Sequence, residues 1–157
     1  MILQPISALL ATKDSVSIVS AIKAAIERTD DAPFWKQKTP LLVEAILSVL
    51  IPLREQKLLF DPEGNHKEAL DAELLLRWCD LMSLRGLAFT LAKSNDANEL
   101  LKLKFTADGY KPIDLETLGK YLSSYSVDLT NEMVDFPVSN YNLHIGMASL
   151  LERVLKD

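Results

Sequence analysis

The side chains that most often carry catalysis or bind metals are scarce: the chain holds one cysteine, Cys79, and two histidines, His66 and His144. None falls into an HExxH or CxxC spacing, the arrangements that bring zinc ligands together. His66 lies in a polar turn, where solvation explains it better than metal binding. For His144, beside the apolar stripe of a predicted helix, a surface or capping role is a better explanation than catalysis. Cys79 is predicted to be a small buried apolar residue rather than a nucleophile.

Loops that cradle phosphate and acid pairs suited to proton transfer are not evident in the sequence either. The pair Gly119-Lys120 has neither the upstream glycine nor the following serine or threonine of a Walker motif. Acidic residues such as Asp30-Asp31 and Asp61 sit in predicted turns, where solubility and capping explain them better than acid–base work. We therefore predict that this chain is not an enzyme, and we expect no cofactor and no bound metal.

The composition indicates one helical domain. The chain has 157 residues, of which 48% are hydrophobic, enough for a single domain with a sizeable core. It has only five glycines, and no Asn-Gly or Asp-Gly pair stands between two alternating apolar runs, which argues against a strand-and-turn protein. The formal charge is −5, whereas a dedicated nucleic-acid binder is usually basic. A single cysteine cannot form an internal disulfide, which favours a reducing compartment.

The sequence shows no segment with the features of a targeting signal or a membrane span. Residues 1–11 are mildly apolar, but they lack a basic start and contain Pro5. The apolar run at 41–53 is shorter than the ~20 residues that a spanning helix needs, and Glu44 interrupts it. We therefore expect a soluble, cytoplasmic chain without direct membrane insertion.

The stretch 34–57 predicts the helix around which the other elements pack. Between positions 41 and 53 only Glu44, Ser48 and Pro52 are not apolar, so this helix must be covered on most sides. Because a step of four residues drifts by only about 40° around a helix, these three residues share the one face expected to meet solvent. Pro52 on that face is expected to bend the helix around the core, and the freed carbonyl of Ser48 needs water or the Ser48 hydroxyl.

Two points about this helix follow less directly from the sequence. It begins either at Pro33 or at Thr39-Pro40, where Thr39 would cap the helix and Pro40 would occupy its first turn. The inner face must include Ile46, Val49 and Leu50, and their exposure would contradict the assignment.

The remaining elements are assigned from apolar residues at three- and four-residue spacing. Helices are predicted at 14–29, 68–80, 83–93, 96–103, 114–124 and 139–156, with a loop at 106–112 and a weak pattern at 127–138. The buried face of the first helix is expected to include Val16 and Ile22, and Asp14 or Ser15 can cap its start. The sequence therefore predicts an all-α fold, a compact bundle of about six to seven helices around a long, buried, curved central helix. A single domain is expected over the whole chain.

Basic residues next to aromatic ones mark two candidate contact sites for a protein partner or a phosphate backbone. The first is Trp35, Lys36 and Lys38 at the start of the central helix, and the second is Lys102 with Lys104. Lysines on a solvated helix surface are the commoner explanation of both groups.

Three stretches carry a family resemblance: the helix that opens with Pro-Phe-Trp-Lys at 33–36 and closes with Pro-Leu-Arg-Glu at 52–55, the run LLLRWCDLMSLRGL at 74–87, and Asn-Leu-His-Ile-Gly at 142–146. Together they resemble the all-alpha domain inserted in the nucleotide-binding domain of the coupling proteins of conjugation and type IV secretion systems. Pro40 inside the helix departs from the family's pattern, and the return helix lacks the family's stronger polar residues. The Walker motifs of this family lie outside the inserted domain.

The resemblance implies that the chain is a domain excised from a hexameric inner-membrane ATPase that delivers DNA or protein to a secretion channel. It implies substrate recognition at the cytoplasmic mouth of that ATPase, and it transfers no catalytic residue to this sequence. The implied partners are secretion substrates or relaxosome proteins, the parent nucleotide-binding domain and, weakly, DNA. The alternative is a freestanding helical adapter or chaperone-like interaction protein that exposes an apolar groove.

Overall fold

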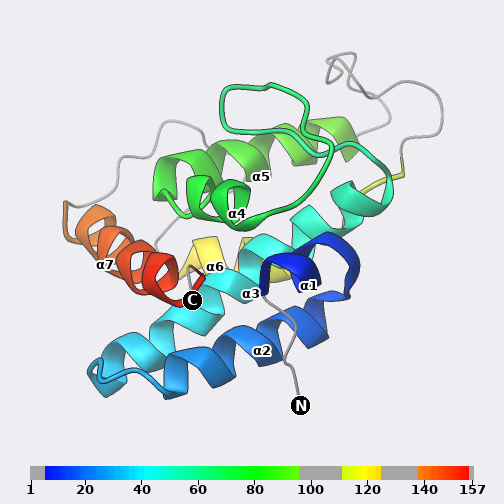
Figure 1. Cartoon of the computed structure of the whole chain (residues 1–157). Helices are drawn as coiled ribbons and strands as arrows, with labels where there is room; N and C mark the ends of the chain where they lie inside the picture. The colour runs from blue at the N-terminus through cyan, green and yellow to red at the C-terminus, as the bar shows by residue number, and fades with distance from the viewer. Residues whose placement is uncertain (1–5, 96–110, 125–137, 156–157) are drawn as a thin grey trace.

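Helix α3, which spans Pro33–Glu55, crosses the middle of the molecule and is the central helix that the sequence predicts (Figure 1). The computed structural model describes residues 6–95, 111–124 and 138–155, and in these ranges it contains seven helices and no β-strand. The other six are α1 Ile6–Thr12, α2 Ser15–Glu27, α4 Ala72–Arg77, α5 Leu81–Asn95, α6 Glu116–Ser123 and α7 Val138–Leu155. The predicted all-α bundle is confirmed.

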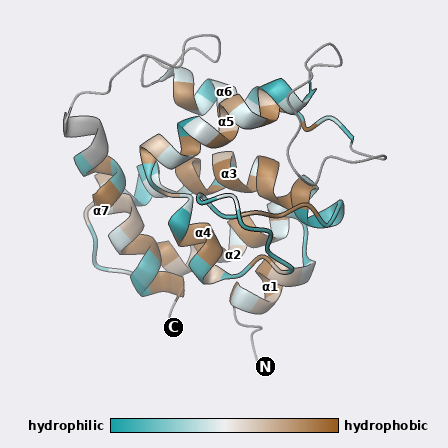
Figure 2. Cartoon of the chain, turned by 90° about the horizontal axis from the view of Figure 1, so that it is seen from above, coloured by the Kyte–Doolittle hydropathy of each residue, from teal (hydrophilic) through white to brown (hydrophobic). Residues whose placement is uncertain are grey.

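Helices from distant parts of the chain enclose α3. Helices α2, α6 and α7 pack directly against it, and α4 and α5 both pack against α7. In Figure 1, α2 lies on one side of α3, and α4 and α5 lie on the other. In Figure 2, apolar residues occupy most of α3, while the outer helices alternate between polar and apolar faces. The core therefore forms from helices at both ends of the chain, α2 and α7, packed against α3 in the middle.

The start of α3 agrees with one of its two predicted positions, and its inner face agrees with the prediction. The helix begins at Pro33, a first-turn position where a missing amide donor costs nothing. Thr39 and Pro40, the other candidate start, lie inside the helix and are buried. Val49 and Leu50 are fully buried, as a core helix requires.

The outer face of α3 differs in part from the prediction. Glu44 is exposed as expected, but Ser48 and Pro52 are half-buried and so less exposed than predicted. The hydroxyl of Ser48 donates to the carbonyl of Ala45 at 2.6 Å, so it does not satisfy its own carbonyl. Leu41 lies seven positions before Ser48 on this same face and is largely exposed. The solvent-facing side of α3 is therefore more apolar than expected.

Helix α2 has the predicted cap but a shifted inner face. The carboxylate of Asp14 accepts a hydrogen bond from the amide of Ser17 at 2.8 Å, which satisfies one free donor of the first turn. Three isoleucines form the buried face: Ile18, Ile22 and Ile26. Val16 is 76% exposed, contrary to the prediction, because two residues of helix turn it by about 200° from Ile18.

Helix α4 is shorter than the predicted helix at 68–80. It begins after Asp71, whose carboxylate accepts a hydrogen bond from the amide of Leu74 at 2.9 Å, and it ends before Trp78. Leu70 is buried ahead of the cap, but the exposed residues 63–69 before it form a loop rather than a helical turn. The apolar spacing at 68–80 therefore combines a loop anchor with a short helix.

The later helices start close to their predicted positions. Asp80 caps α5 by accepting a hydrogen bond from the amide of Ser83 at 3.0 Å, so α5 begins slightly earlier than expected. The predicted helices at 114–124 and 139–156 correspond to α6 and α7. The predicted helix at 96–103, and most of the segments 106–112 and 127–138, lie outside the described residues. The sequence did not predict α1, which packs against α2 and α4.

Candidate functional site

Trp35, one of the predicted contact residues, packs against α7. A Cβ atom at Gly146 would lie only 2.4 Å from the nearest ring carbon of Trp35, so only glycine permits this close approach. Phe34 meets Trp35 edge-on, with ring centroids 5.1 Å apart. Phe34 is 49% exposed and Ile145 is 63% exposed, whereas Trp35 is half-buried. We refer to Phe34, Trp35, Ile145 and Gly146 as the tryptophan seam.

The predicted basic residues do not form one cluster. Lys36 is half-buried, and its ammonium group donates to the carbonyl of Glu27 at 3.2 Å, where a cation also favours the carboxyl end of α2. Lys38 is exposed, one helical turn after Phe34. Lys102 and Lys104 lie outside the described residues. Of the two predicted lysines that the structure describes, Lys38 is the one placed to meet a partner next to the tryptophan seam.

An ion pair connects the turn between α2 and α3 to α7. Arg153 donates to one carboxylate oxygen of Asp31 at 2.9 Å. The hydrogen bond from Arg153 is the main reason that the pKa of Asp31 lies below its ordinary value. The other oxygen, Oδ2 of Asp31, is buried and has no hydrogen-bond partner among the described residues. Asp31 therefore links α7 to the turn before α3. The prediction of a solvated turn residue omits this ion pair.

His144 is 2% exposed, which corrects the prediction of a surface or capping role. Its Nε2 lies 2.8 Å from the hydroxyl of Tyr121, and the two rings meet edge-on. Because Tyr121 belongs to α6 and His144 to α7, the contact joins two helices that both pack against α3. The hydrogen bond gives the buried imidazole a polar partner and so explains His144 without catalysis.

Asp61 is buried in the loop between α3 and α4, where sequence predicted a solvated turn. Burial alone raises its pKa, but hydrogen bonds from the amides of Asn65 and Glu63, with the nearby charge of Arg77, outweigh it and hold the pKa below its ordinary value. Arg77 lies 3.2 Å from the Asp61 carboxylate and also pairs with Glu63. Asp61 therefore closes a compact loop and attaches it to α4.

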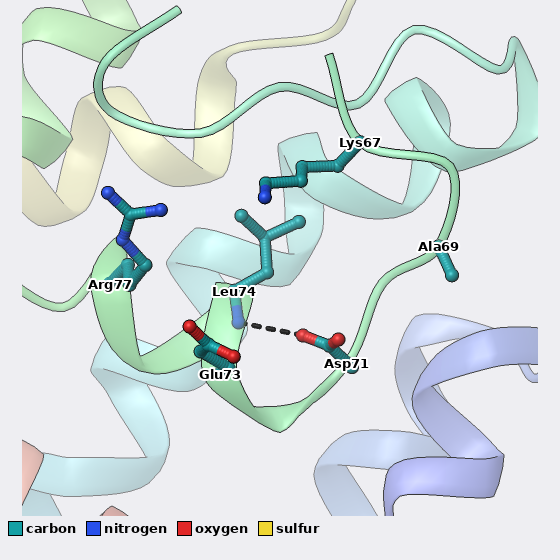
Figure 3. A pocket seen from close by; sticks show the side chains of 6 residues that line it. All are labelled: Lys67, Ala69, Asp71, Glu73, Leu74 and Arg77. Atoms are coloured by element: carbon teal, nitrogen blue, oxygen red, sulfur yellow. Dashed lines mark hydrogen bonds between the residues drawn. The ribbon is translucent and has the colours of Figure 1, made fainter. Parts of the chain in front are cut away.

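A small hollow opens beside this loop (Figure 3). Six side chains line it: Lys67, Ala69, Asp71, Glu73, Leu74 and Arg77. Its volume is about 260 Å³, including the part open to solvent. Two cations face two carboxylates across it, Arg77 is already paired, and Asp71 is engaged as the cap of α4. The hollow therefore has balanced charge and offers little selectivity for an ionic ligand.

The remaining titratable candidates fit structural roles. Cys79 is buried as predicted, and burial raises the pKa of its thiol to about 12. His66 is exposed, with Nε2 3.1 Å from the carbonyl of Lys57. In the part of the chain that the structure describes, no three His, Cys, Asp or Glu residues come together as metal ligands.

The sequence predicts Trp35 as a contact residue but does not reveal the residues of α7 that lie beside it. In the sequence Gly146 stands out only as part of the stretch 142–146, because a glycine inside a helix does not by itself show close approach: Gly86 in α5 has nothing within 4 Å of a Cβ position. Ile145 stands at an outward position of α7, but that follows only once the buried positions of α7 are known. Asp61 shows no local signal of burial, because Arg77 is distant in sequence.

No protein-family model matches this chain, and no curated protein or solved structure resembles it at a significant level. Among the described helices, none has the length and apolar character needed to cross a bilayer.

Proposed function

We propose that this chain is a substrate-recognition domain, of the kind found as the all-alpha domain of type IV secretion and conjugation coupling proteins. The observation that carries the proposal is the tryptophan seam, where an aromatic and an aliphatic side chain stand exposed on either side of a rigid helix contact. Exposed aromatic and aliphatic side chains on a fixed backbone are typical of protein-contact sites.

The arrangement of two of the three resembling stretches supports the narrower part of the proposal. The helix that opens with residues 33–36 is α3, and its Trp35 lies on Gly146 from the stretch 142–146. The stretch 74–87 comprises the end of α4, a turn at 78–80 and the first part of α5; Ser83-Leu84, where the resemblance implies the turn, lies inside α5. The stretches 33–36 and 142–146, far apart in the sequence, are thus in direct contact, which is compatible with both belonging to one domain.

The charge distribution favours a protein partner over DNA. The net charge is −5, and in the described part of the seam region Lys38 is exposed whereas Lys36 is held by the carbonyl of Glu27. A site that follows a phosphate backbone normally gathers several unpaired cations. The proposed partners are therefore secretion substrates, relaxosome proteins or the parent nucleotide-binding domain, with at most weak contact to DNA.

A transfer assay tests the role of the seam. In cells that encode this chain within a transfer system, the double variant Phe34→Asp, Ile145→Asp is expected to reduce transfer to recipient cells by about tenfold or more, because it places charge on the contact surface. The matched control is Val16→Asp, an exposed apolar residue of α2 away from the seam. Unchanged transfer by a stably folded double variant would contradict the proposal.

A gel-shift titration tests the choice between protein and DNA. Purified chain is titrated against single- and double-stranded DNA at several salt concentrations, and we expect little retention. Retention that weakens steeply with rising salt would show phosphate contact and favour a DNA-binding role instead. The flanking coding sequence separates a coupling-protein domain from a freestanding adapter or chaperone-like protein, because Walker motifs encoded on both sides would exclude the freestanding protein.

A further inference from the structure

Two side-chain amides hold a short segment of the chain at the ends of α3 and α5. Gln56, next after α3, donates to the carbonyl of Lys111 at 3.0 Å and accepts from the amide of Lys111 at 2.9 Å. Asn95, the last residue of α5, donates to the carbonyl of Ile113 at 2.7 Å and accepts from the amide of Ile113 at 2.9 Å. Each carboxamide therefore binds both backbone groups of one residue, as a neighbouring β-strand would.

The spacing of the four hydrogen bonds is that of an extended strand. Lys111 and Ile113 are two positions apart, so in an extended segment their N–H and C=O groups point to the same side. Pro112 stands between them, at the position whose backbone groups point away from the amides. A proline has no amide donor to satisfy, so it fits this position at no cost in hydrogen bonding. Gln56 and Asn95 thus pair with residues 111 and 113 as two residues of a neighbouring β-strand would.

Side-chain recognition of the segment is limited to one residue. Ile113 is buried, whereas its neighbours Lys111, Pro112 and Asp114 are exposed. The amides bind backbone groups that every residue except proline possesses. Another peptide can therefore make the same contacts if it has an aliphatic side chain at the position of Ile113.

We propose that Gln56 and Asn95 form a binding site for an extended peptide of a protein partner, and that residues 111–113 occupy this site when the partner is absent. The partner peptide needs non-proline residues at two alternate positions and an aliphatic side chain at the second. Strand-like pairing with a peptide backbone is an established mode of protein recognition. The chain's own segment competes at a high effective concentration, so exchange requires a partner that is concentrated nearby, as in an assembly.

The amide site is separate from the tryptophan seam. Gln56 follows the last residue of α3 and Phe34 lies at its beginning, so a helix of roughly 30 Å lies between them. Loss of peptide binding at the amides and loss of contact at the seam can therefore be measured independently. The peptide site goes beyond the proposed function and does not depend on it.

Fluorescence polarisation with a labelled peptide tests the site. The probe is an acetylated peptide with the sequence of residues 111–115, Lys-Pro-Ile-Asp-Leu. The variant Ile113→Ala weakens the chain's own segment but keeps both amides, and it is expected to bind the probe about tenfold more tightly than the unchanged chain. If Ile113→Ala does not fold, Lys111→Pro serves instead, since it removes one donor from an exposed position.

Two controls decide whether any binding uses the amides. Adding Gln56→Ala and Asn95→Ala to the opened variant is expected to weaken probe binding by about tenfold or more. A probe that is N-methylated at its isoleucine lacks the donor to Asn95 and is expected to bind as weakly. No probe binding by a folded, opened variant would overturn the proposal, and so would equal binding of the methylated probe.

Discussion

At the scale of single residues, Gly146 permits the contact on which the tryptophan seam depends. The ring of Trp35 occupies the space that a Cβ atom would need, with ring carbons at 2.4 and 2.7 Å from its ideal position. The ring is half-buried and packed against the core, so a Cβ atom at Gly146 would force the ring or α7 to shift. The glycine therefore sets the distance between α3 and α7.

We expect Gly146→Ala to lower the free energy of unfolding by roughly 1–3 kcal/mol, because it overpacks this contact. Gly86 is the matched control, since a Cβ atom there meets nothing within 4 Å. There the change to alanine should stabilise helix α5 by up to ~1 kcal/mol. Urea unfolding of both variants measures the two effects, and equal stability changes would show that the close approach is not required.

Asp61 should make the stability of the protein depend on acid pH. Its folded-state pKa lies below the ordinary value of 3.8, so its ionised form stabilises the fold above pH 3.8. That contribution is lost as the pH falls from 3.8 through the folded-state pKa. We expect Asp61→Asn to be less stable than the unchanged chain at pH 7, with the difference shrinking below pH 3.8.

Urea unfolding at several pH values measures this dependence. Asp30→Asn serves as the control, because Asp30 is an exposed residue of the turn between α2 and α3. Its effect at pH 7 should stay within about 0.5 kcal/mol. A constant difference between Asp61→Asn and the unchanged chain across the acid range would contradict the assigned role of the carboxylate.

Cys79 should be unreactive in the folded protein. Burial raises the pKa of its thiol to about 12, so almost no thiolate is present near pH 8. We expect a thiol-labelling reagent at pH 8 to modify the chain rapidly in urea and slowly without it. Labelling at the same rate in both conditions would show that the cysteine is accessible in the fold.

At the scale of elements, Arg54 attaches α1 to the end of α3. Its side chain is only 9% exposed, and it donates to the carbonyl of Leu10 at 2.6 Å. A cation at the carboxyl end of α1 also favours the helix dipole. This contact spans 44 positions of sequence, which is why local patterns did not reveal α1.

We expect Arg54→Met to loosen α1 while the rest of the bundle stays folded, because methionine retains packing but loses the donor. Hydrogen exchange of the amides in residues 6–12 should become faster, with little change in the buried part of α3. Glu44→Gln is the control, since Glu44 is an exposed residue of α3 ten positions before Arg54. Unchanged exchange in α1 would show that other contacts hold this helix.

The elements show how far sequence patterns reach. The central helix was predicted because a continuous apolar run needs no knowledge of its neighbours. The apolar spacing overestimates the length of α4 because Leu70, although it lies in the loop before the helix, is buried like a helical position. The burial of His144 depends on Tyr121, which lies 23 positions away, and no local spacing predicts that pairing.

At the scale of the whole molecule, α7 completes the core. It packs against α2, α3, α4 and α5, and its buried apolar side chains include Met147, Leu150, Leu151 and Val154. Burying each of these contributes roughly 1.5–3 kcal/mol before the conformational entropy of ordering α7 is subtracted, so losing all four would remove a substantial apolar contribution to stability. The segment nearest the end of the chain is therefore needed for the middle to fold.

A chain that ends at residue 137 is expected to lose its cooperative thermal transition, because it lacks this buried stripe. Circular dichroism during heating measures the transition. Addition of a synthetic peptide with the sequence of residues 138–155 should restore part of it. The control is Ser149→Ala, an exposed position of α7 that should leave the transition unchanged. A sharp transition in the shortened chain would show that α7 is dispensable.

The two tryptophans give the molecule separate optical reporters. Trp78 is 2% exposed and its indole N–H donates to the carbonyl of Phe60 at 3.2 Å, so its emission should be blue-shifted and insensitive to the surroundings. Trp35 is half-buried and borders an exposed aromatic ring, so its emission should lie further to the red and change when a partner covers the seam. With Trp78 replaced by phenylalanine, the spectrum of one native indole would record docking without any attached dye.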